Sequence, residues 1–141
     1  MKDSQRVILG IDPGTQIVGY GVILVDKRST HYVDMGVIDI RKEKDHFAKL
    51  NTIYTEVSSL IQRYSPNVLA IEAPFYGNQN PQVMLKLGRA QGAAIAAAIS
   101  SIRGRKEIAT YPFFTISSLT FSIFSTEPYV LSIISVSASV N

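Results

Sequence analysis

Two acidic residues stand directly after short apolar segments, and this placement suits them to one kind of chemistry. Asp12 follows Ile-Leu-Gly-Ile, and Glu72 follows Val-Leu-Ala-Ile. If both segments are neighbouring central strands, the two carboxylates converge on a divalent cation that prefers oxygen ligands, such as Mg²⁺ or Mn²⁺. Two such ions about 4 Å apart activate water and stabilise the leaving oxygen in phosphodiester hydrolysis. We therefore expect a carboxylate metal site without a nucleophilic side chain.

Each acid also has a plainer interpretation. Asp12 precedes Pro13-Gly14, and aspartate before Pro-Gly is common in turns, so its position alone leaves both interpretations open. The plainer interpretation is weaker for Glu72, because a glutamate that follows an apolar strand is costly to bury unless it is paired or liganded.

The segments that lead to the two acids have the patterns of strands. Residues 7–12 alternate with a period of two and end at a Pro-Gly turn, which predicts a strand that ends at Asp12. Residues 19–25 and 32–40 are rich in β-branched and aromatic side chains and predict an antiparallel hairpin joined to that strand. Residues 68–71 form a short apolar run typical of a buried strand.

Two helices are predicted beside these strands. Apolar residues in 45–64 recur at steps of three and one until Pro66 stops the pattern. Residues 82–101 are rich in alanine and other strong helix formers. Small residues on this second helix permit close approach to a sheet or to a second subunit: Gly88, Gly92 and Ala93.

The order of these elements predicts an α/β domain with a mixed sheet, a hairpin start and flanking helices. A doubly wound dinucleotide-binding sheet is not expected, because no GxGxxG motif opens a helix after the first strand.

Composition narrows the class of protein further. The chain has 141 residues and no cysteine, which excludes disulfides and thiolate metal sites. Its N-terminus lacks the apolar segment of a signal peptide, so we expect a cytoplasmic protein. Residues 1–106 hold all 14 basic residues and nine of the acidic ones. The resulting net charge of +5 weakly favours polyanionic partners.

The C-terminal part of the chain differs from the rest. Residues 108–141 contain a single charged residue, Glu127, and twelve serines and threonines. The uncharged stretch 108–126 is a poor membrane span, because Pro112 and many hydroxyl side chains interrupt it, so we expect no membrane contact. We divide the chain into a core, residues 1–107, and an atypical tail, residues 108–141, whose composition suggests the hypothesis of an out-of-frame or truncated end.

Two ordered blocks of sequence resemble the RuvC family of Holliday junction resolvases. They are ILGIDPGTQIVGYGVI at residues 8–23 and LAIEAPFYGNQNPQVMLKLGRAQGAAIAAA at residues 69–98. With the segment between them, the resemblance covers residues 7 to about 103. It implies the RNase H-like fold and a crossover junction endodeoxyribonuclease of DNA recombination and repair. The family acts as a Mg²⁺-dependent homodimer on four-way junctions, with branch-migration proteins as partners.

The resemblance also implies roles for individual residues. Asp12 and Glu72 match the first two of the family's catalytic acids. Phe75, with Tyr76 beside it, matches an aromatic that packs against bases at the opened crossover, although core packing is the alternative. The following loop, residues 77–81, is one residue longer than usual. Lys86 and Arg89 are three apart on one helix and suit contacts with phosphates, or else form a solvated helix face.

The tail departs from the family, which closes its site with two more acids near the start of a C-terminal helix. No basic residue follows Lys106, and Glu127 has no acidic neighbour. We therefore expect the catalytic competence of this chain to be doubtful. His31 and His46 match no family ligand and are expected at the surface.

Two other functions stay open from the sequence. The first is a non-catalytic fragment that binds junctions or dimerises through the alanine-rich helix. The second is an actin-like phosphate-binding fold, since Gly10 to Thr15 resembles the phosphate-binding turn of those ATPases. That fold needs a second, similar half, for which this chain is too short.

Overall fold

The computed structural model describes residues 5–26, 29–73, 80–101 and 107–112. These residues form a five-stranded sheet and two helices. In chain order the elements are β1 (Gln5–Asp12), β2 (Ile17–Asp26), β3 (Ser29–Asp39), α1 (His46–Tyr64), β4 (Val68–Ala73), α2 (Pro81–Ser101) and β5 (Glu107–Pro112).

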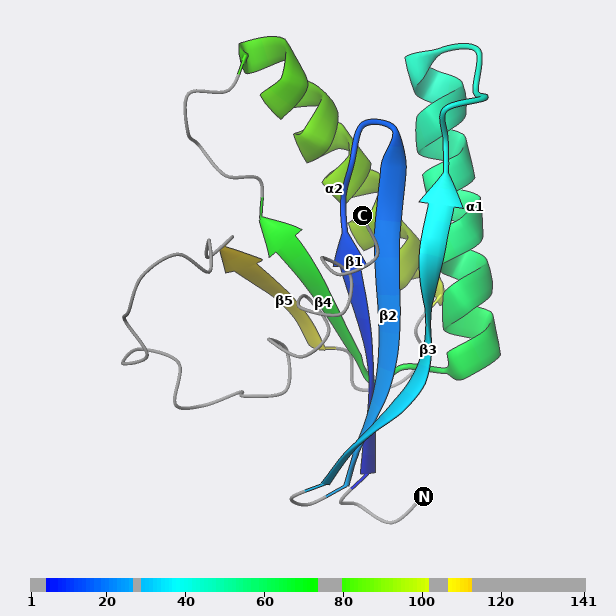
Figure 1. Cartoon of the computed structure of the whole chain (residues 1–141), viewed down its shortest axis with the longest axis vertical. Coiled ribbons are helices and arrows are strands. Elements are labelled where there is room, and N and C mark those ends of the chain that lie inside the picture. Colours follow the sequence, from blue (N-terminus) through cyan, green and yellow to red (C-terminus); the bar gives the residue numbers. More distant parts are fainter. Residues whose placement is uncertain (1–4, 27–28, 74–79, 102–106, 113–141) are drawn as a thin grey trace.

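The sheet is mixed, and its strands run in the order β3-β2-β1-β4-β5 (Figure 1). The first three strands form antiparallel pairs, whereas β4 lies parallel to β1 and β5 lies parallel to β4. A parallel neighbour needs a crossover connection, and α1 and α2 supply the two crossovers. β1 therefore lies at the centre, between the hairpin and the parallel half.

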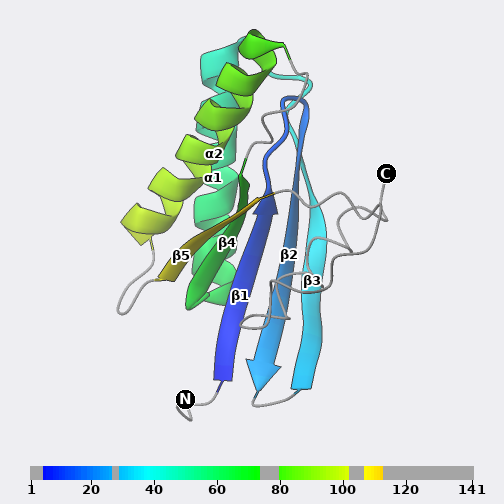
Figure 2. The same ribbon diagram turned by 90° about the vertical axis from the view of Figure 1, so that its left-hand side faces the viewer.

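Both helices pack on the same face of the sheet (Figure 2). α1 begins where the side chain of Asp45 accepts a hydrogen bond from the backbone N–H of Ala48 at 2.9 Å, which satisfies one of the free donors of the first turn. It ends at Ser65, which has a left-handed conformation with φ of 47° and donates its N–H to Ile61. Pro66 follows and prevents further helix.

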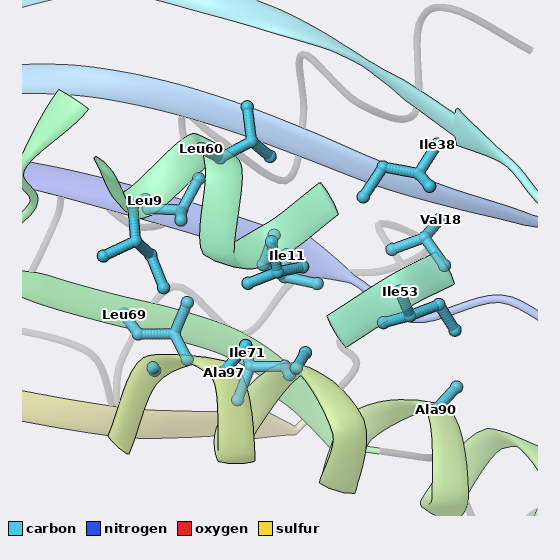
Figure 3. Close-up of a cluster of buried hydrophobic side chains, with 14 of the residues drawn as sticks. Leu9, Ile11, Val18, Ile38, Ile53, Leu60, Leu69, Ile71, Ala90 and Ala97 are labelled. Atoms are coloured by element: carbon cyan, nitrogen blue, oxygen red, sulfur yellow. The ribbon is translucent and has the colours of Figure 1, made fainter. Parts of the chain in front are cut away.

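The main core fills the space between the sheet and the helices (Figure 3). Full burial of a leucine or isoleucine side chain stabilises a fold by about 1.5–3 kcal/mol, so this layer holds most of the fold's stability. α2 contributes alanines, which let its backbone lie close to the sheet. Buried members of this core are Leu9, Ile11, Val18, Val22, Ile38, Ile40, Ile53, Val57, Leu60, Ile61, Leu69, Ile71, Ala90, Ala94, Ala97 and Ala98.

A smaller apolar cluster lies on the opposite face of the sheet. Because side chains alternate along a strand, the neighbours of the main-core residues point to this face. Neither of the two described helices packs here (Figure 2). The members are Ile8, Ile23, Val25, Val68 and Ala70.

A hydrogen-bonded group of three side chains ties the edge strand β3 to the end of α1. Tyr64 and Tyr20 both donate their hydroxyls to the carboxylate of Asp34, Tyr20 at 3.4 Å. The hydrogen bond from Tyr64 is the main reason that the pKa of Asp34 is lowered. Tyr20 lies so close to Gly36 that a Cβ there would be 2.8 Å from its hydroxyl oxygen.

The predicted α/β class, the hairpin start and both helices are confirmed. β5 was not predicted, and its described residues continue the sheet past the predicted boundary at residue 107. In the part of the chain that the structure describes, neither helix is long and apolar enough to cross a membrane.

Candidate active site

The topology brings Asp12 and Glu72 together near the C-terminal ends of the inner strands β1 and β4. β1 and β4 are parallel neighbours, and Ile11 pairs with Ile71, so the two acids occupy the next position on each strand. Ile11 and Ile71 belong to the main core, and alternation therefore turns both carboxylates to the face away from the helices. Both acidic residues are half-buried.

The two carboxylates are close enough to share a hydrogen bond, which confirms the predicted proximity. Burial first, and then the hydrogen bond and the negative charge of Asp12, raise the pKa of Glu72 to about 8. Two carboxylates within hydrogen-bond reach repel each other when both are ionised. At neutral pH the pair therefore retains a proton unless a cation replaces it.

The surrounding structure fixes the backbone on both sides of the pair. The side chain of Gln91 on α2 donates to the backbone carbonyl of Glu72 at 3.1 Å. After Asp12 the chain turns tightly, since a Cβ at Gly14 would be 1.9 Å from the carbonyl oxygen of Ile17. Glycine is therefore required in this turn.

Gln91 was missed by the sequence analysis. Gln91 has no local sequence signal for this role, because its partner is a backbone carbonyl nineteen residues earlier. The packing of α2 on β4 creates the contact.

The other predicted site residues fall into two groups. Phe75 and Tyr76 lie outside the described residues. Lys86 and Arg89 are exposed on α2, as both interpretations of this helix face require. Among the histidines, His31 is exposed as expected, but the surface prediction is wrong for His46, which is partly buried at the start of α1 with its Nε2 covered.

No cluster of three or more potential metal-binding side chains occurs among the described residues. The carboxylate pair is thus the set that these residues offer to a cation. Its hard oxygen donors and its unfavourable double charge both fit a divalent ion such as Mg²⁺.

A mixed five-stranded sheet with acids at the ends of β1 and β4 defines an RNase H-like protein, and solved structures share this fold. Thermus thermophilus RuvC in complex with a Holliday junction substrate matches with a TM-score of 0.65 and 24% identity, over 76% of this chain and 64% of that one. The yeast mitochondrial Holliday junction resolvase Ydc2 matches with a TM-score of 0.57 and 16% identity, over 74% and 50%.

The family follows from sequence. The family model described as crossover junction endodeoxyribonuclease RuvC matches residues 8–114, and the chain belongs to the RuvC family. Proteins with that same description are 55% identical in Bacteroides fragilis, over 69% of this chain and 51% of the relative, and 52% identical in Cytophaga hutchinsonii, over 70% and 49%. Membership of the RuvC family rules out the alternative of an actin-like phosphate-binding fold.

The chain spans about half the length of these curated relatives. The matched half contains the strands that carry Asp12 and Glu72.

Proposed function

We propose that this chain is the catalytic core of a metal-dependent endonuclease that acts on four-way DNA junctions in recombination and repair. The observation that carries this proposal is the Asp12–Glu72 pair at the ends of β1 and β4. Membership of the RuvC family supports it, as does the name crossover junction endodeoxyribonuclease that the relatives bear.

Asp12 and Glu72 are the residues that would hold the cation, with Mg²⁺ as the proposed ion and Mn²⁺ as a substitute. When bound, a divalent ion supplies Lewis acidity and lowers the pKa of a coordinated water. The chain's own contribution is a fixed pair of oxygen donors, with Glu72 held through Gln91 and Asp12 through the tight turn at Gly14.

Other residues would position the DNA. Lys86 and Arg89 are exposed on α2 and suit contacts with phosphates, which orient DNA without reading its sequence. Phe75 and Tyr76 follow Glu72 closely in the chain, and we propose that Phe75 stacks on a base near the crossover.

We also propose that two copies of the chain associate through the outer face of α2. A Cβ added at Gly88 or Gly92 meets no atom of the described residues within 4 Å, so neither glycine contacts the sheet. With the exposed Leu85 and Ala96, these glycines form a stripe at helical spacing. Such a stripe permits close helix approach, and two active sites would suit a four-way substrate. We expect this dimer in the cytoplasm, alongside branch-migration proteins.

Junction preference tests the proposed function. The 141-residue protein should bind a synthetic four-way junction more tightly than a duplex of the same sequence, in competition binding with Mg²⁺ replaced by Ca²⁺. Affinity should fall steeply with salt, because lysines and arginines displace counterions. Equal affinity for duplex and junction would contradict the proposed function.

The alternative is a non-catalytic fragment that binds junctions and whose carboxylate pair holds no cation. Such a fragment would also prefer junctions to duplexes. Any change in junction affinity on addition of Mg²⁺ would then be the same in Asp12→Asn as in the wild type. Under our proposal Asp12→Asn abolishes that effect, because the cation is bound next to the DNA.

A further inference from the structure

A pocket of about 440 Å³ lies on the helix side of the sheet, beside the β1–β2 turn. The turn at Gly14 to Gln16 forms one wall, and the others come from residues within 40–53, which include the start of α1, and from the first half of α2. These three segments come together at the upper end of the molecule in Figure 1. Apolar side chains from the main core, such as Ile53, form part of the lining.

Three lysines from separate segments line this pocket. Lys49 donates from its Nζ to the backbone carbonyl of Thr15 at 3.2 Å and to the side-chain oxygen of Gln16 at 3.1 Å. An ammonium has three donors, so one remains for a ligand. Lys44 and Lys86 are exposed, and neither forms an ion pair with another residue in the described ranges.

The two acids in the lining are already engaged. Asp45 caps α1 by accepting from the N–H of Ala48 at 2.9 Å, and Glu43 accepts from the hydroxyl of Thr52 at 2.8 Å. Three lysines against two carboxylates leave the lining with a net positive charge.

His46 gives independent evidence of a missing partner. It lines the pocket, and its Nε2 is buried without a hydrogen-bond partner among the described residues. A buried polar atom that lacks a partner costs about 1–3 kcal/mol, and a phosphate oxygen would remove that cost.

We propose that this pocket binds a phosphate group of the DNA backbone. The inference rests on the proposed function and adds a contact behind the catalytic pair. Gly14, two residues after Asp12, lines the pocket, so the β1–β2 connection borders both the carboxylate strand and the pocket. Because the carboxylates face away from the helices and the pocket lies on the helix side of the sheet, the pocket would hold a phosphate other than the one that is cut.

The first experiment uses inorganic phosphate as the probe. In NMR titrations of the 141-residue protein at fixed pH, phosphate should shift the imidazole resonances of His46 saturably. It should leave those of His31 unchanged, because His31 is exposed on β3. Lys49→Gln and Lys44→Gln should each weaken this response, whereas Lys42→Gln, an exposed lysine next to the pocket but outside its lining, should not. An unmoved His46 would overturn the proposal.

The second experiment separates DNA from free phosphate. Lys44→Gln should lower junction affinity about 3–10-fold and reduce the salt dependence by about one counterion, whereas Lys42→Gln should not. If phosphate shifts His46 but Lys44→Gln and Lys49→Gln leave junction affinity unchanged, the DNA contact is overturned. If the wild type shows no junction preference while His46 responds, the proposed function fails and the phosphate pocket stands.

Discussion

At the scale of single residues, the candidate site consists of two carboxylates that are more costly to ionise together than apart. Glu72 is half-buried and hydrogen-bonded to Asp12, and these causes raise its pKa. The sequence indicated that a glutamate after an apolar strand needs a partner. It could pair Glu72 with Asp12 only on the condition that their strands are neighbours, since the two are far apart in the chain and meet through the parallel pairing of β1 and β4.

This raised pKa predicts how stability depends on pH without metal. Below pH 4.5 Glu72 is protonated in both the folded and the unfolded chain. Between about 4.5 and 8 the folded chain keeps a proton that the unfolded chain releases, so the free energy of unfolding falls as pH rises and levels off above 8. Urea unfolding in EDTA across this range should show the fall, and Glu72→Gln should flatten it. Parallel curves for wild type and Glu72→Gln would contradict the assigned shift.

At the scale of the elements, sequence patterns predicted most strands and both helices, because alternation and helical spacing are local signals. β5 was missed because it is a short segment whose strand character comes from pairing with β4, a long-range contact. The partial burial of His46 was missed for a similar reason, since the pocket forms only when α1, α2 and the β1–β2 turn meet. Gly88 and Gly92 left a choice between sheet and second subunit, and the structure turns both away from the sheet.

The two faces of α2 should respond differently to substitution. Ala94 is fully buried against the sheet, so Ala94→Leu should overpack the core and cost about 1–3 kcal/mol in the free energy of unfolding. Gly92→Arg should keep or slightly raise stability, because glycine is a poor helix former by about 1 kcal/mol. It should, however, prevent self-association in sedimentation measurements. A Gly92→Arg protein that still dimerises would show that the interface lies elsewhere.

At the scale of the whole molecule, the chain spans about half the length of its curated relatives. The described residues offer two acids to a cation, and no larger cluster of ligands occurs among them. The fold that positions the pair is complete enough to be matched with solved RNase H-like structures, whereas Glu127, the one acid of the tail, lies outside the described residues.

The 141-residue protein is therefore predicted to bind junctions without resolving them, even with Mn²⁺. Two carboxylates leave a two-metal site short of ligands, and water is then not positioned for in-line attack. Gel analysis of a labelled four-way junction should show no paired nicks above background. Symmetric nicking that Asp12→Asn abolishes would show that another residue of the chain completes the site.

Paramagnetic broadening by Mn²⁺ tests whether Asp12 and Glu72 form a divalent-cation site. In NMR spectra of the 141-residue protein, substoichiometric Mn²⁺ should broaden the amide signals around Asp12 and Glu72 first, and Mg²⁺ should reverse the effect by competition. Asp12→Asn and Glu72→Gln should each weaken Mn²⁺ binding at least about tenfold, because each removes one of two charged ligands. Broadening centred elsewhere, or unchanged in both variants, would show that Asp12 and Glu72 do not form the cation site.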